Sequence, residues 1–99
     1  MIKVKTLTEI IKILKEHKEE LKERHKIKQI RVFGSYVRGE QKETSDIDII
    51  VDFEEIPTFI EFIKIQEELE KLLGVRVDLL TEESISPFIK QYIKEVVIV

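Results

Sequence analysis

The sequence of 99 residues contains no cysteine, no asparagine and no alanine, and it has only three glycines and two prolines. The lack of cysteine excludes disulfide bonds and thiolate metal sites. No apolar run approaches the roughly 20 residues that a membrane-spanning helix needs, so we expect no membrane partner. The first residues contain no hydrophobic signal-peptide core, which indicates a cytoplasmic protein.

A basic excess is also missing, because 17 Lys and Arg face 20 Asp and Glu and the net charge is -3. Proteins that hold long nucleic acids usually carry a basic stripe, so this balance argues against a long nucleic acid as partner. With 42% hydrophobic residues we expect a single globular domain over 1–99. The abundance of Lys and Glu without Asn or Cys is typical of proteins from thermophiles.

Hydrophobic periodicity predicts alternating helices and strands. Helical patterns cover about 7–26, a short turn at 35–39, a segment opened by Pro57 that ends before Gly74, and a segment after Ser86. Strand patterns cover 27–33, 46–53 and 75–81. Thr6 and Glu9 fit a capping box at the first helix. The apolar tail Val96–Val99 fits a fourth strand, a helix end or a partner contact. The predicted fold class is α/β (α+β), a small mixed β-sheet flanked by helices.

The distribution of acidic residues is uneven, with sixteen Glu but only four Asp. Glu suits exposed helix surfaces, whereas all four Asp fall in predicted strands, where Asp is normally depleted. These residues are Asp46, Asp48, Asp52 and Asp78. The short side chain of Asp holds a metal close to the backbone, so the pattern indicates a metal site. Chance and solvation of strand ends are the alternative explanations.

Two short motifs lie close together in the middle of the chain. Gly34 and Ser35 follow a predicted strand, where backbone N–H groups of a turn can face a phosphate. Asp46 and Asp48 stand two apart on the next strand, so both point to one face, and carboxylate oxygens suit Mg²⁺. Alone, each motif is more often a plain turn or a solvated strand edge. Together, they predict a site for nucleotidyl transfer.

The run Gly34 to Glu40, the pair Asp46 and Asp48, and the later Asp78 resemble the minimal nucleotidyltransferases of the DNA polymerase β superfamily. The resemblance extends over nearly the whole chain and implies a polymerase β-like nucleotidyltransferase fold. It also implies the individual roles of the motif residues, without a departure at any motif position.

By this resemblance, Gly34 allows the triphosphate of ATP to approach the backbone, and Ser35 donates to a phosphate oxygen. Asp46 and Asp48 are the catalytic carboxylates and bind Mg²⁺. Asp78 completes the site for a second ion and helps to deprotonate the attacking hydroxyl. Two ions about 4 Å apart stabilise both the attacking and the leaving oxygen of an in-line displacement.

Members of this length resemble the antitoxin half of a pair whose toxin is a helical HEPN-type ribonuclease. The resemblance implies transfer of AMP from ATP to a tyrosine hydroxyl of that toxin, which silences it. A short chain without an acceptor-binding domain needs an acceptor that brings its own surface, as a protein does. The alternatives are an antitoxin that acts by contact alone and a nucleotidyltransferase for a small molecule, although the latter usually has an extra domain.

Residues close to the motifs have simpler interpretations. Arg38 either contacts phosphate or braces the loop by pairing with Glu40 or Glu43, and bracing is favoured. Asp52 lies roughly 13 Å from Asp48 along the strand, which is too far for it to be a direct metal ligand.

The histidines and tyrosines are interpreted as structural. His17 and His25 lie on a charged helix without a third ligand, which predicts surface residues. Tyr36 and Tyr92 are predicted to pack, although Tyr36 borders the Gly34 turn and has the nucleotide within its reach.

Overall fold

The computed structural model of the chain describes residues 5–42, 45–91, 93 and 95–99. Its elements are α1 (Leu7–His25), β1 (Ile27–Phe33), α2 (Ser35–Arg38), β2 (Ile47–Phe53), α3 (Phe59–Leu73), β3 (Val77–Thr81), the 3₁₀ turn η1 (Glu82–Ser84), α4 (Pro87–Lys90) and β4 (Val96–Ile98). The strands form one sheet in the order β3-β2-β1-β4. β1 is antiparallel to β2 and β4, whereas β2 and β3 are parallel. This arrangement confirms the predicted mixed sheet.

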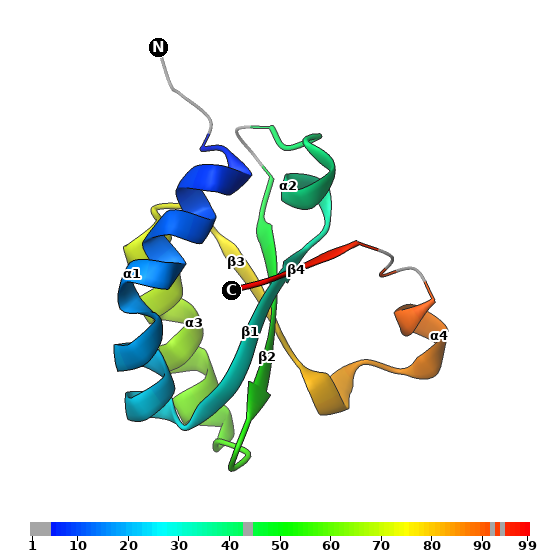
Figure 1. The fold of residues 1–99 in the computed structure, drawn as a ribbon. Helices are drawn as coiled ribbons and strands as arrows, with labels where there is room; N and C mark the ends of the chain where they lie inside the picture. The colour runs from blue at the N-terminus through cyan, green and yellow to red at the C-terminus, as the bar shows by residue number, and fades with distance from the viewer. Residues whose placement is uncertain (1–4, 43–44, 92, 94) are drawn as a thin grey trace.

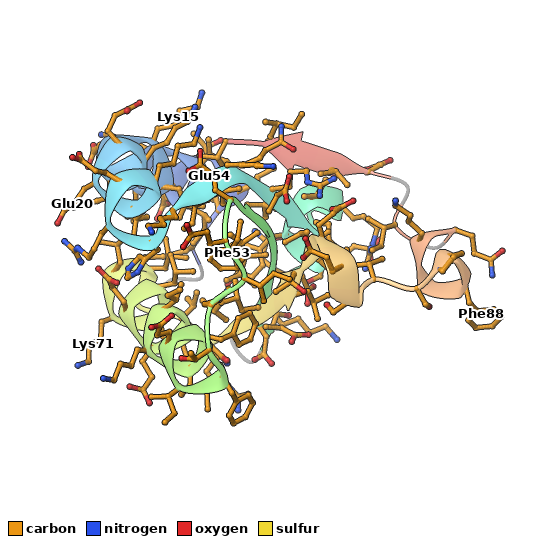
Figure 2. The ribbon with its side chains drawn as sticks, turned by 90° about the horizontal axis from the view of Figure 1, so that it is seen from below. Lys15, Glu20, Phe53, Glu54, Lys71 and Phe88 are labelled. Carbon is orange, nitrogen blue, oxygen red and sulfur yellow. The ribbon has the colours of Figure 1, made fainter. Side chains whose placement is uncertain are left out.

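Helices α1 and α3 lie side by side on one face of the sheet, and α4 lies on the other side (Figure 1). Apolar side chains of both helices and of all three long strands form the core between these layers, and its fully buried members include Ile10, Leu14, Ile30, Ile47, Ile49, Leu69 and Leu73. In Figure 2, Lys15, Glu20 and Lys71 point outward from the helices, whereas Phe53 lies in the interior. None of the described helices is long and apolar enough to cross a membrane.

The ends of the long helices follow local sequence signals. The Thr6 side chain accepts a hydrogen bond from the Glu9 N–H at the start of α1, as the sequence predicts. At α3, Thr58 is the N-cap and forms a reciprocal capping box with Glu61. The prediction that Pro57 opens this helix is therefore wrong by two positions, because the Thr58 hydroxyl supplies the cap. Gly74 ends α3 with a φ of 70°, as predicted.

The last part of the chain differs most from the sequence-based expectation. The helix after Ser86 ends at Lys90, earlier than the apolar pattern predicts, and the packing predicted for Tyr92 lies outside the described residues. The tail resolves into the strand β4, which extends the sheet along β1. The Val99 N–H then donates to the Ile30 carbonyl oxygen at 2.9 Å, and the Val99 side chain is buried.

The face of the sheet opposite α1 and α3, called here the open face, carries the polar residues. Phe33, Asp48 and Asp78 are paired across β1, β2 and β3, and Arg31, Ile50 and Leu80 form the next row. The acidic residues on this face of β2 predict that it is either exposed to water or occupied by cations. Instead, Ile50 is 1% exposed, because η1 packs against β2. Within its row Ile50 is buried while Arg31 and Leu80 are half-buried, and in the neighbouring row Asp48 is half-buried and Asp78 is exposed.

Candidate active site

Gly34 connects the turn after β1 with the carboxylates on β2. It adopts a φ of 84° and a ψ of -152°, a backbone conformation that essentially only glycine occupies. A Cβ atom at this position would lie 2.0 Å from Asp48 Oδ2. The Asp48 carboxylate therefore packs directly on the Gly34 backbone, and the two motifs of the sequence form one site.

Asp48 and Asp78 are brought together by the parallel pairing of β2 and β3, in which they stand directly opposite each other. The pKa of Asp48 is raised to about 6, chiefly by burial and also by the charge of Asp78, a hydrogen bond between the two carboxyl groups and the charge of Asp46. Arg38 opposes it. Asp78 itself is exposed. The pair thus concentrates negative charge at a place that a cation would stabilise.

Asp46 lies one residue before β2, and its carboxylate has a different partner. Its Oδ1 is 3.2 Å from Nε of Arg76, and both side chains are largely exposed. The charge of Asp46 still contributes to the raised pKa values of Asp48 and Tyr36. The structure therefore places Asp46 near the carboxylate pair, with its own oxygen held by a guanidinium group.

The donor set fits a hard divalent cation. Among the residues that the structure describes, no three His, Cys, Asp or Glu side chains converge closely enough to enclose a metal ion. Mg²⁺ does not require such a cage, because it usually binds through one or two carboxylates together with substrate phosphates and water. Asp48 and Asp78 supply two oxygen ligands side by side, so the residues present fit Mg²⁺ in the presence of a nucleotide.

The remaining motif residues surround this pair. Ser35 begins α2, and the N–H groups of Val37 and Arg38 bond to the Gly34 carbonyl oxygen. The Arg38 Nε pairs with Glu40 at 3.3 Å, which is the favoured bracing arrangement, while Glu43 lies outside the described residues. Tyr36 is 2% exposed and packs in the core as predicted, and burial raises the pKa of its hydroxyl.

Two outlying residues clarify the limits of the site. Asp52 stands opposite Gln29 of β1 in the strand register, near the far end of β2 and away from Asp48. His25 is not a free surface residue as predicted, because its Nε2 lies 2.6 Å from Glu68 on α3 and its side chain is 18% exposed. This contact joins α1 to α3 and lies on the helix side of the sheet.

Arg76 is the residue that the sequence-based site lacks. The signal in the sequence was its position two residues before Asp78, on the same face of the strand pattern. A basic residue at that spacing from an acidic site can act as its counter-ion, but the rule has many false positives on exposed strands.

Known proteins are similar to this chain in sequence and in fold. The model of the family described as nucleotidyltransferase domain matches residues 14–99. The protein adenylyltransferase MntA of Thermococcus cleftensis is 57% identical over 95 residues, which cover 95% of this chain and 96% of that protein. The chain therefore belongs to the nucleotidyltransferase domain family.

Solved structures extend the comparison to complexes. A chain in the complex of a tri-AMPylated HEPN toxin of Shewanella oneidensis with MNT antitoxin matches with a TM-score of 0.63 and 26% identity, over 92% of this chain and 68% of that one. A chain in a toxin–antitoxin crystal structure with AMP-PNP matches with a TM-score of 0.59 and 33% identity, over 80% of this chain and 59% of that one. These similarities confirm the predicted resemblance to the nucleotidyltransferases of HEPN/MNT toxin–antitoxin pairs.

Proposed function

We propose that this protein is a Mg²⁺-dependent protein adenylyltransferase that acts as an antitoxin. It transfers AMP from ATP to a tyrosine hydroxyl of a cognate HEPN-type toxin. The observation that carries the proposal is the contact between Gly34 and Asp48, because it unites a turn suited to phosphate with two adjacent carboxylates. The relatives named for adenylyl transfer and for toxin–antitoxin complexes support the choice of substrate and partner.

Each motif residue has a role in this proposal. The Gly34 backbone, free of a side chain, accepts the close approach of the triphosphate, and the Ser35 hydroxyl donates to a phosphate oxygen. Asp48 and Asp78 hold the cation, and Asp46 joins them as the third carboxylate. When bound, Mg²⁺ neutralises charge on the phosphates and on the leaving oxygen.

The transfer itself is a single in-line displacement. The tyrosine oxygen forms a bond to the α-phosphorus while the bond from that phosphorus to the bridging oxygen of pyrophosphate breaks. The hydroxyl proton passes to Asp78, whose exposed carboxylate stands next to Asp48 on the open face. Pyrophosphate leaves with the electron pair of the broken bond.

A mass measurement tests this function. The protein is mixed with MgATP and its cognate HEPN protein, and the HEPN protein is weighed by mass spectrometry. We expect gains in multiples of AMP on a tyrosine, their loss with Asp48→Ala, and their persistence with the control Asp52→Ala on the same strand. A stable complex without added mass would instead indicate an antitoxin that acts by contact. Label on RNA ends would contradict both functions.

A further inference from the structure

The ion pair between Asp46 and Arg76 occupies a special position in the site. It is held in place by the backbone, because the Ile47 N–H donates to the Arg76 carbonyl oxygen at 2.9 Å and Ile47 pairs with Val77 in the β2–β3 ladder. Asp46 and Arg76 therefore flank the first hydrogen bond between the two strands that carry Asp48 and Asp78. Their proximity follows from the register of the sheet.

The Asp46 carboxylate lies close both to the carboxylate pair of Asp48 and Asp78 and to the guanidinium of Arg76. Its position two residues before Asp48 directs both side chains to one side of an extended chain, and its charge contributes to the raised pKa of Asp48. Its Oδ1 nevertheless contacts Arg76 Nε at 3.2 Å, and among the described residues no three acidic side chains converge closely enough to hold a metal ion. The guanidinium of Arg76 thus neutralises Asp46, which is the third carboxylate that the proposed metal site needs beside Asp48 and Asp78.

Exposure makes this ion pair easy to exchange. The Arg76 side chain is 74% exposed and that of Asp46 is 47% exposed, so water and salt screen their attraction. Exposed pairs of this kind contribute little net stability. A divalent cation or a nucleotide phosphate, each with a higher charge, competes effectively for either partner.

We propose that Arg76 is an exchangeable counter-ion of the active site. In the structure its guanidinium forms an ion pair with Asp46. When a cation draws Asp46 toward Asp48 and Asp78, the released guanidinium binds a phosphate of the nucleotide. This inference rests on the proposed function, because it assigns to Arg76 a positioning role toward the metal and a contact with ATP.

The proposal requires opposite effects on two ligands. Removing the charge with Arg76→Gln frees Asp46, so a divalent cation alone should bind about two- to fivefold more tightly, as expected for an exposed ion pair. The same change removes a charged donor to phosphate, so the nucleotide complex should bind about tenfold more weakly. A residue that only stabilises the fold would not produce opposite shifts.

The experiment uses the purified protein with Mn²⁺ alone and with Mn²⁺ plus AMP-PNP, each measured by isothermal titration calorimetry. Arg76→Gln is compared with the parent, with Arg76→Lys, which retains the charge and should keep the parent's affinity for Mn²⁺, and with Arg24→Gln. Arg24 is a matched control, since it is also an exposed arginine in ion pairs, with Glu20 and Glu68, on the helix side of the molecule.

Tighter Mn²⁺ binding together with weaker AMP-PNP binding in Arg76→Gln alone supports the proposal. In a parent that binds both ligands, any other combination overturns the role of Arg76 and leaves the adenylyltransferase function intact. A parent that binds neither Mn²⁺ nor AMP-PNP overturns the proposed function, and the role of Arg76 with it.

Discussion

Around Asp48, residues on the two faces of β2 have opposite effects on the stability of the fold. Toward α1 and α3, Ile47, Ile49 and Val51 are 0% exposed, and their burial stabilises the fold. On the open face, between these residues in sequence, the carboxylate of Asp48 is crowded by Asp78 and its pKa is raised to about 6. One strand therefore separates stability from chemistry by alternation, and substitutions at neighbouring positions should have different consequences.

The largest effect on stability is expected on the helix side. Ile49→Ala should lower the free energy of unfolding by about 2–5 kcal/mol, because it removes buried methyl groups and leaves a cavity. Thermal unfolding followed by circular dichroism should show a Tm lower by roughly 10 °C or more. Ile60→Ala is the control, since Ile60 is 67% exposed and should change stability by less than about 0.5 kcal/mol. Similar losses of stability in Ile49→Ala and Ile60→Ala would contradict the conclusion that burial toward α1 and α3 stabilises the fold.

At the boundary of the site, Gly34→Ala should damage stability and binding together. The unfavourable φ costs about 1–3 kcal/mol, and the new Cβ must displace the Asp48 carboxylate. Gly39→Ala is the matched control, since Gly39 also has a positive φ of 72° but the methyl group that alanine would add there meets no atom within 4 Å beyond its chain neighbours. Urea unfolding should show a lower stability in both variants. Calorimetry with Mn²⁺ and AMP-PNP should show weaker binding only in Gly34→Ala.

On the open face, the pH dependence of stability should have an unusual sign. The pKa of Asp48 is raised from 3.8 to about 6 in the folded protein, so the folded state binds more protons between these values. Stability therefore falls as the pH rises from about 4 to above 6. Partial exposure screens the effect, and we expect about 1–2 kcal/mol.

Asp48→Asn tests this sign directly. In metal-free buffer the stability of the variant should not decrease as the pH rises from about 4 to above 6. At pH 7 the variant should be more stable than the parent, as measured by urea unfolding. Addition of Mg²⁺ with AMP-PNP should stabilise the parent and leave the variant unchanged. A parent whose stability rises between pH 4 and 6.5 relative to the variant would contradict the assigned shift.

The smallest effect is expected at the contact between the two long helices. Glu68→Gln weakens the pairs with Arg24 and His25, whose partly exposed geometry limits the loss to less than about 1 kcal/mol. The loss should shrink at high salt, because ions screen exposed pairs. Glu67→Gln, at an exposed neighbouring position, serves as the control in the same urea titrations. A loss of stability that is independent of salt would indicate that Glu68 acts through packing and not through its charge.

The sequence predicts the parts of this molecule that depend on local signals. Strand β1 has the predicted bounds 27–33, because an apolar pattern meets a glycine that must adopt a positive φ. Gly34, Asp48 and Asp78 come together as the family resemblance implies, although alternation within each strand gives only the face on which each residue lies. Ser35 and Asp46 keep their predicted places in the chain, while their roles in binding stay predictions.

Features that depend on distant partners are less accessible from the sequence. The tail 96–99 becomes a strand only because β1 offers a free edge. Ile50 is buried by η1, which follows it by some thirty residues in the chain, and His25 is fixed by Glu68 across two helices. The partnership of Asp46 with Arg76 likewise depends on the register of β2 and β3.

The parallel pairing of β2 with β3 also has a kinetic consequence. Asp48 and Asp78 belong to strands separated by α3, so the pair does not exist until a loop of that length has closed and its entropic cost has been met. Closure also brings two like charges together, which opposes this step. A divalent cation would act on the closed state alone. During refolding, metal binding should therefore develop with the protection of β3 amide protons from exchange, and the occupied site would slow the reopening of this sheet edge.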